Sequence, residues 1–255
     1  MWRFFFELCD ILCELVPGRA NREWIRRVKL YDYRKKLKCL KHAFPDLNFK
    51  KMRLVKGGWN IGFIVDNRYM FKIRKSYDNK HAEEKILREK RITDAFARIV
   101  PVKIPKINVA TSGEYIFYYY EFIPGVNLNN LPAKQIAAHR EKLGRVLGEF
   151  IYKMHNAYPK TIADLATPTE PGSDGWNHHD LCNNILVNPE TMEITGIIDW
   201  EYAGFGPLKT EFRNSILFSR AMMKSSIIME IMYHYYSLCD KKVPKKSAVK
   251  SAKAK

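Results

Sequence analysis

The chain has 255 residues, 46% of them hydrophobic, which is enough to bury a sizeable core and excludes a disordered polypeptide. Its five cysteines are scattered without metal-binding spacing, and no stretch reaches the roughly 18 apolar residues of a membrane-spanning helix, so we expect a reduced, cytoplasmic chain. The net charge of +17 is concentrated near the ends: residues 19–41 hold ten basic side chains against two acids, and residues 241–255 hold seven lysines and no acid.

The first predicted element is an amphipathic helix that ends at Pro17-Gly18, within an N-terminal helical extension at residues 1–45. Beside the basic segment 19–41, this helix can lie on an anionic membrane, which makes residues 1–41 a candidate peripheral contact with the inner membrane face. Two other interpretations stay open. Acids on the polar face of the helix oppose anionic lipid, so the helix can dock on the protein's own core, and the basic residues can form a solvated face.

Short runs rich in β-branched and aromatic residues dominate residues 46–123, and turn-forming pairs separate them. The pattern predicts three strands, one helix and two further strands, in the order 51–55, 61–66, 69–74, 81–97, 100–109 and 115–122. Pro101 and Pro105 interrupt the fourth strand, and Pro124-Gly125 ends the last one.

From residue 124 to residue 240 the chain is predicted to be mainly helical. The predicted elements are a long helix, a loop, a hairpin-like pair of strands and further helical material, at 133–155, 158–177, 185–187 with 194–198, and 212–238. The lysine-, alanine- and serine-rich segment 241–255 is predicted to be disordered.

Two polar clusters flank the predicted strand pair. Asp180 and Asn184 are four residues apart on the loop before it, and Asp199 follows its second strand. Phosphoryl transfer needs such a set, because one carboxylate orients the attacking hydroxyl and accepts its proton, while a carboxylate and an amide hold the Mg²⁺ ions that neutralise the phosphates. Asp180 is therefore the candidate base, and Asn184 and Asp199 are the candidate metal ligands.

The segments 178–187 (HHDLCNNILV) and 197–201 (IIDWE) resemble the catalytic motif and the metal loop of the aminoglycoside phosphotransferase and choline kinase superfamily. The resemblance implies an α+β, two-lobed protein-kinase-like fold, with an antiparallel-sheet N-lobe at 46–123 and a mainly helical C-lobe at 124–240. It also implies a kinase that uses Mg²⁺ and moves the γ-phosphate of ATP or GTP onto a hydroxyl group of a small molecule.

The resemblance further implies a set of nucleotide contacts. Gly57, Gly58 and Asn60 lie where the family has a glycine-containing loop over the phosphates, since glycine lets the backbone approach closely and present N–H groups. Lys72 matches the lysine that contacts the α- and β-phosphates, and Glu89 matches the helix glutamate that pairs with this lysine.

The segment from residue 121 to residue 125 resembles the hinge between the lobes. Near Glu121 and Ile123, the resemblance implies that the backbone hydrogen-bonds the adenine edge. We expect structural roles for His155, at the end of a helix, and for His178, which would position the catalytic loop through backbone contacts. We assign no role to His179.

The chain departs from the family pattern in the catalytic loop, because Asn184 is the fourth residue after Asp180, where the family usually has the amide at the fifth. Asn183 is the alternative metal ligand. Since small displacements of catalytic groups are costly, a catalytically silent, membrane-docked nucleotide-binding protein is the alternative hypothesis.

Two kinds of acceptor are compatible with the sequence. Acids and tyrosines after Asp199 fit a cation such as choline, while the basic ends fit a sugar of a cell-surface glycan. Neither an aromatic-interleaved sheet motif nor a zinc-finger spacing is found, so nucleic acid is not a predicted partner.

Overall fold

The structure is a computed structural model that describes residues 17, 30–55, 60–74, 79–168, 170–216 and 220–239. The predicted helix before Pro17 and the tail 241–255 lie outside the described residues. Within the described part, no helix combines the length and hydropathy needed to cross a membrane.

The chain divides into two compact units. Unit 1 comprises Met1–Leu87 and Ile107–Phe122, and unit 2 comprises Arg88–Lys106 and Ile123–Lys255. The predicted first lobe, 46–123, includes residues 88–106, whereas the structure groups these residues with unit 2. The reason is that Ile92 and Phe96 in this stretch are fully buried in the main hydrophobic core of unit 2.

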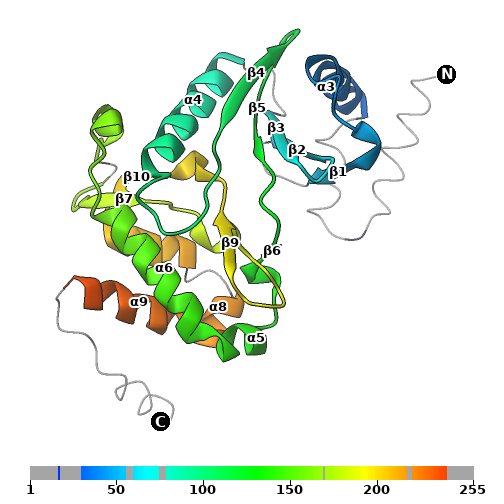
Figure 1. Ribbon diagram of the computed structural model, residues 1–255. Coiled ribbons are helices and arrows are strands. Elements are labelled where there is room, and N and C mark those ends of the chain that lie inside the picture. Colours follow the sequence, from blue (N-terminus) through cyan, green and yellow to red (C-terminus); the bar gives the residue numbers. More distant parts are fainter. Residues whose placement is uncertain are drawn as a thin grey trace. The chain divides into compact units, whose positions relative to one another are not determined.

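Unit 1 is built on a five-stranded antiparallel sheet with the strand order β1-β2-β3-β5-β4 (Figure 1). Its strands are β1 (Met52–Val55), β2 (Asn60–Val65), β3 (Tyr69–Arg74), β4 (Asn108–Ser112) and β5 (Tyr115–Glu121). The predicted positions of four strands are confirmed to within one residue at each end. The expected strand at 100–109 was wrong, because β4 begins only at Asn108, after Pro101 and Pro105, which cannot donate ladder hydrogen bonds.

Each face of this sheet has its own apolar core, since side chains alternate between the faces of a strand. On one face, Leu40 of α3 (Leu30–Ala43) packs with Phe71 of β3. On the other face, Ile86 of α4 (Asn79–Phe96) packs with Met70. The alternation places Lys72 on the same face of β3 as Met70.

Unit 2 is mainly helical. Its helices include α5 (Ala133–Ala138), α6 (Arg140–His155), α7 (Leu208–Thr210), the π-helical η6 (Glu211–Ile216), α8 (Arg220–Ser225) and α9 (Ile227–Leu238). The predicted single helix 133–155 is therefore two helices, separated at His139, whose φ of −116° and ψ of 14° are not helical.

The helices α6 and α9 lie side by side (Figure 1). Gly144 and Gly148, four residues apart on α6, allow this close approach. A Cβ atom at Gly148 would lie 2.7 Å from the backbone oxygen of Ile231, and one at Gly144 would lie 2.4 Å from Cβ of Glu230. Two larger residues at these positions would force the helices apart.

Short strands frame two loops of unit 2. β7 (Gly175–Asn177) pairs with β10 (Gly204–Gly206), and a second sheet has the order β6-β8-β9, made of β6 (Val126–Asn127), β8 (Ile185–Val187) and β9 (Ile194–Ile197). The predicted strand pair is therefore confirmed as β8 and β9. The loop from β7 to β8 carries Asp180, and the loop from β9 to β10 carries Asp199.

Candidate functional site

Asp180 lies on the loop between β7 and β8, at the start of the short 3₁₀ helix η4 (Leu181–Asn183), and is half-buried. Both carboxylate oxygens accept hydrogen bonds from amide side chains. Asn183 Nδ2 donates to Oδ1 over 3.1 Å, and Asn184 Nδ2 donates to Oδ2 over 3.1 Å. Asn184 Nδ2 also donates to the backbone oxygen of Asp180 over 2.8 Å. The four-residue loop thus closes as one turn whose amides orient this carboxylate.

The strand pairing brings the second loop to this turn. Ile185 of β8 is opposite Ile197 of β9, and the N–H of Ile198 donates to the backbone oxygen of Asn184 over 3.0 Å. Asp199 follows in the left-handed region, with φ and ψ both 65°. The pKa of Asp180 is raised above its usual value, because burial and the negative charge of Asp199 together outweigh the lowering effect of the two amide bonds. The two carboxylates are therefore close enough to interact.

These residues present the oxygen atoms that Mg²⁺ prefers. Because Asn184 donates through Nδ2, its Oδ1 is the atom that can bind a cation, and Asp199 adds a carboxylate. No group of three or more His, Cys, Asp or Glu side chains that could hold a metal occurs in the described ranges. A Mg²⁺ ion bound with phosphates needs only one or two protein carboxylates, so the donor set fits this ion.

His178 is fully buried and connects the two loops. Its Nε2 lies 3.1 Å from the backbone oxygen of Ile198, and its Nδ1 lies 3.4 Å from the backbone N–H of Asp180. Burial lowers the pKa of His178 to about 4, so the ring is neutral at neutral pH. A neutral ring that donates from Nε2 can accept at Nδ1, and this tautomer satisfies both contacts. The expected positioning through backbone contacts agrees with this geometry.

Two buried glutamates accept hydrogen bonds from backbone N–H groups of the two loops. Glu211 accepts hydrogen bonds at Oε2 from the backbone N–H groups of His178 and, over 3.2 Å, of His179. Glu89 accepts one at Oε1 from the backbone N–H of Trp200, the residue after Asp199, over 3.1 Å. From the sequence, Glu211 was expected only as one of the acids after Asp199 that suit a cationic acceptor or stand where the family has a structural acid. Glu89 was expected only as a partner of a lysine.

Unit 1 contains several of the residues that were predicted to contact the nucleotide. Lys72 is buried in the middle of β3, and its Nζ lies 5.6 Å from the ring centroid of Tyr118 on β5. Asn60, the first residue of β2, is also buried, and its Oδ1 has no hydrogen-bond partner among the described residues. Gly57 and Gly58 lie outside the described residues.

Of the two predicted hinge positions, Glu121 lies next to the last residue of a unit 1 stretch, and Ile123 is the first residue of the unit 2 stretch that follows. Glu121 is the last residue of β5, is exposed, and stands opposite Tyr69 of β3. Ile123 is buried in unit 2, where its side chain lies against Gly196 of β9. His155, at the end of α6, is buried with its ring between the hydroxyl of Tyr235 and the carboxylate of Asp174.

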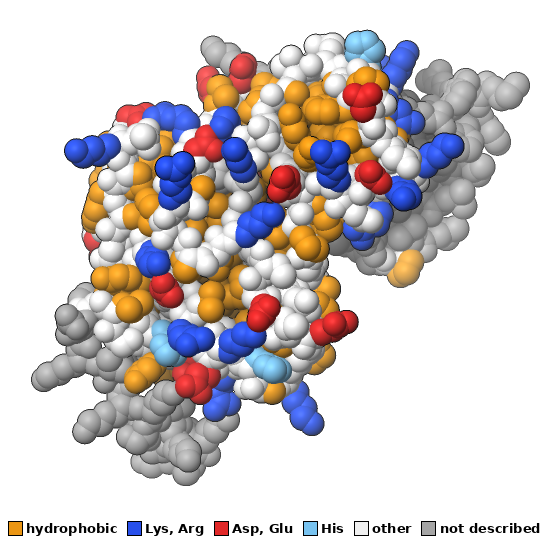
Figure 2. Space-filling model, viewed as in Figure 1, with side chains coloured by type: hydrophobic (Ala, Val, Ile, Leu, Met, Phe, Trp, Pro, Cys, Tyr) orange, Lys and Arg blue, Asp and Glu red, His pale blue; other side chains and the backbone are white. Residues whose placement is uncertain are grey.

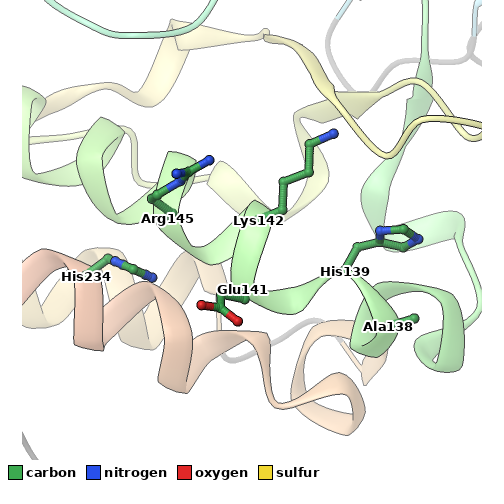
Figure 3. Close-up of a pocket in the computed structure, with 6 residues that line it drawn as sticks. All are labelled: Ala138, His139, Glu141, Lys142, Arg145 and His234. Carbon is green, nitrogen blue, oxygen red and sulfur yellow. The ribbon is translucent and has the colours of Figure 1, made fainter.

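A pocket of about 400 Å³ lies elsewhere in unit 2 and contains none of the predicted site residues (Figure 3). It is lined by Ala138, His139, Glu141, Lys142, Arg145 and His234. Figure 3 shows that Lys142 and Arg145 point to one side of α6, while Glu141 points toward His234 of α9. Because this pocket contains none of the predicted site residues, the candidate active site remains at Asp180.

Comparisons with known proteins identify the family and the fold. The profile of the phosphotransferase enzyme family matches residues 57–172 and 157–221. The GDP and kanamycin complex of APH(2")-IIia is similar in structure, with 17% sequence identity, coverage of 81% of this chain and 92% of that one, and a TM-score of 0.59.

Two further solved structures show the same fold. ADP-bound aminoglycoside phosphotransferase APH(2'')-Ib has 13% identity, coverage of 85% of each chain and a TM-score of 0.60. Macrolide 2'-phosphotransferase type I has 13% identity, coverage of 83% of this chain and 84% of that one, and a TM-score of 0.56. A search of curated proteins found no match. The chain has the α+β protein-kinase-like fold and belongs to the phosphotransferase enzyme family.

Proposed function

We propose that this enzyme moves the γ-phosphate of ATP or GTP to a hydroxyl group of a small molecule, with Asp180 as the base. The oxygen of the acceptor forms the new O–P bond, its proton passes to the Asp180 carboxylate, and the nucleoside diphosphate leaves. The observation that carries the proposal is the orientation of Asp180 by two amides, one on each oxygen, beside the loop of Asp199. Positioning of this kind supplies most of the catalysis in phosphoryl transfer.

For the nucleotide, we propose that Asn184 and Asp199 hold Mg²⁺, which neutralises phosphate charge when it is bound. Lys72 would contact the phosphates, with Asn60 and the loop at Gly57 and Gly58 near them. The buried Oδ1 of Asn60, which has no partner in the described part of the chain, supports this assignment, because a buried polar atom is normally satisfied by a partner. The adenine or guanine edge would meet the backbone near Glu121 and Ile123.

The proposed acceptor is a hydroxyl of choline or of a cell-surface glycan sugar. The similar structures include complexes with kanamycin, streptomycin and gentamicin, so this fold accommodates small-molecule ligands of this kind. Close to Asp199, Tyr202 is 52% exposed and Glu201 is half-buried, and these side chains suit a cationic substituent.

We also propose that the enzyme works in the cytoplasm, at the inner membrane face. On the face shown in Figure 2, Lys and Arg side chains are mixed with acids and do not gather in one patch. Supporting basic positions are instead the exposed Lys35, Lys38 and Lys41 of α3, within the basic segment 19–41. Changing all three to glutamate should release the protein from anionic vesicles at low salt. Absence of binding by the unchanged protein would refute the membrane contact.

The experiment that tests the function compares melting temperatures with and without Mg²⁺ plus ATP or GTP, for the unchanged protein and for Asp199→Asn. A ligand that binds only the folded state stabilises it by about 2.7 kcal/mol at a hundredfold excess over its Kd. We expect a Mg²⁺-dependent shift that Asp199→Asn loses, and the nucleotide that gives it identifies the donor. No shift with either nucleotide would contradict the proposal. A shift without any turnover would favour the silent nucleotide-binding alternative.

A further inference from the structure

Amide side chains from the segment after Ile123 contact the catalytic loop. Asn127 ends β6 and caps the short helix η2 (Leu128–Asn130), because its Oδ1 accepts from the N–H of Asn129 over 2.8 Å. Its Nδ2 donates to the backbone oxygen of Asn183. Asn129 Nδ2 donates to the side-chain Oδ1 of Asn183 over 3.3 Å. Two residues from one short segment therefore hold the backbone and the side chain of Asn183.

The side chain of Asn183 is used at both ends. Its Oδ1 accepts from Asn129, and its Nδ2 donates to Oδ1 of Asp180 over 3.1 Å. Reversing the amide would place two acceptor oxygens and two donor groups against each other, so the contacts at the two ends select the same orientation. In this arrangement the side-chain oxygen of Asn183 accepts from Asn129 and keeps one lone pair, so the alternative role of Asn183 as a metal ligand stays a prediction.

We propose that Asn183, oriented by Asn129, is a positioning residue that sets the direction of the Asp180 carboxylate during phosphoryl transfer. This inference rests on the proposed function, in which Asp180 accepts the proton of the acceptor. A carboxylate oxygen can accept about two hydrogen bonds, so each oxygen of Asp180 keeps a lone pair for the attacking hydroxyl after its amide bond is made. Asn184 already orients Oδ2, and Asn183 is the donor that orients Oδ1.

Asn183 contributes little to packing, which separates this role from a structural one. The residue is exposed, whereas its neighbours Cys182 and Asn184 are buried. Exposed side-chain hydrogen bonds contribute little to the free energy of folding. A small displacement of a catalytic group, in contrast, can lower turnover about a hundredfold. Loss of Asn183 should therefore be visible in turnover and almost invisible in stability.

The hydrogen bonds link Asn129 to Asn183 and Asn183 to Asp180, and this order makes a specific prediction. Among the described residues, the hydrogen bond from Asn129 to the catalytic loop goes to the Asn183 side chain, so the effect of Asn129 on Asp180 should be lost once Asn183 is removed. In a double-mutant cycle, contacting residues that work through one another give strongly non-additive effects. Two residues with separate structural roles give additive effects.

The test measures basal hydrolysis of Mg²⁺-ATP and Mg²⁺-GTP, in which water takes the place of the acceptor. The variants are Asn183→Ala, Asn129→Ala, the double variant and Asn183→Asp, which keeps the size of the side chain and removes the donor. Asn130→Ala is the matched control, because this exposed residue lies on the same short helix and, among the described residues, no side-chain hydrogen bond joins it to the catalytic loop. Asp180→Asn defines the activity without the base.

We expect Asn183→Ala and Asn183→Asp to lower kcat about ten- to a hundredfold with an unchanged KM for the nucleotide and an unchanged melting temperature. Asn129→Ala should lower kcat less, and the double variant should equal Asn183→Ala. Retention of kcat by Asn183→Asp, or additive losses in the double variant, would overturn the positioning role while Asp180→Asn stays inactive. Full activity of Asp180→Asn would overturn the proposed function, and the positioning role with it.

Discussion

The candidate site residues of unit 2 and unit 1 differ in how completely the protein itself holds them. In unit 2, both oxygens of Asp180 accept hydrogen bonds, and the neighbouring His178 is bonded through both ring nitrogens. In unit 1, Lys72 lies over the ring of Tyr118, and Asn60 has a buried oxygen without a hydrogen-bond partner among the described residues. The comparison indicates that the carboxylate proposed for chemistry is preorganised, whereas the Asn60 oxygen proposed for nucleotide binding is completed by the ligand.

The largest expected effect separates turnover from binding. Asp180→Asn keeps the shape of the side chain and removes the group that would accept the proton. We expect kcat to fall about 10²- to 10⁴-fold, the usual contribution of a general base. Nucleotide affinity, measured by the melting shift with Mg²⁺-ATP or Mg²⁺-GTP, should change little. A variant that loses affinity and keeps turnover would reverse the comparison between the units.

A second prediction concerns the anchor of the catalytic loop. Glu211→Ala leaves the backbone N–H groups of His178 and His179 without their buried acceptor. Unsatisfied buried groups cost about 1–3 kcal/mol each, so the loss of two partners should lower the free energy of unfolding by about 2–6 kcal/mol. Urea denaturation measures this loss. Glu190→Ala, at an exposed acid, is the control and should stay within about 0.5 kcal/mol.

If Glu211→Ala and Glu190→Ala were equally stable, unit 2 would not hold its catalytic loop in the way that the hydrogen bonds indicate. Glu211→Gln sharpens the result, because an amide oxygen can still accept from both N–H groups. This variant should recover part of the stability that Glu211→Ala loses, since only the charge of the acceptor is missing.

Local pattern was sufficient to predict much of the fold and the positions of the candidate site. Short runs of β-branched and aromatic residues between turn-forming pairs predicted β2 and β3, and the predicted pair β8 and β9 placed the loops of Asp180 and Asp199 together. The reason is that strand pairs and the loops that join them depend on residues close in the sequence. The roles of the candidate residues remain predictions that the variants test.

What the sequence could not provide depends on contacts between distant segments. Glu211 reaches back 33 residues to His178, and Glu89 reaches forward 111 residues to Trp200. No spacing rule links such pairs. The break between α5 and α6 was also missed, because His139 is neither proline nor glycine and the apolar period continues across it.

A third prediction uses pH to test the burial of His178. The imidazole has a pKa of about 6.5 in an unfolded chain and about 4 in the folded protein. Between these values the unfolded state binds a proton and the folded state does not, so stability falls as the pH falls from 6.5 to 4. Above pH 6.5 neither state is protonated and this contribution is constant.

The measurement compares urea denaturation at pH 7.5 and pH 4.5 for the unchanged protein and His178→Gln. The unchanged protein should lose on the order of 2–3 kcal/mol more than the variant over this interval. Equal losses in the two proteins would mean that the ring is accessible to protons in the folded state. The rigid connection between the two loops of unit 2 would then be absent.

The smallest effect is expected in unit 1, where Lys72→Met keeps the long side chain over Tyr118 and removes its charge. Without nucleotide, the free energy of unfolding should stay within about 1 kcal/mol, because an unbranched apolar side chain fills the same buried space. With Mg²⁺ and nucleotide, the Kd should rise about tenfold or more, since a hydrogen bond to a charged group contributes about 1.5–3 kcal/mol. Lys85→Met, at an exposed lysine of α4, should leave both quantities unchanged. If Lys72→Met destabilised the free protein and bound nucleotide normally, Lys72 would be a structural residue and not a nucleotide contact.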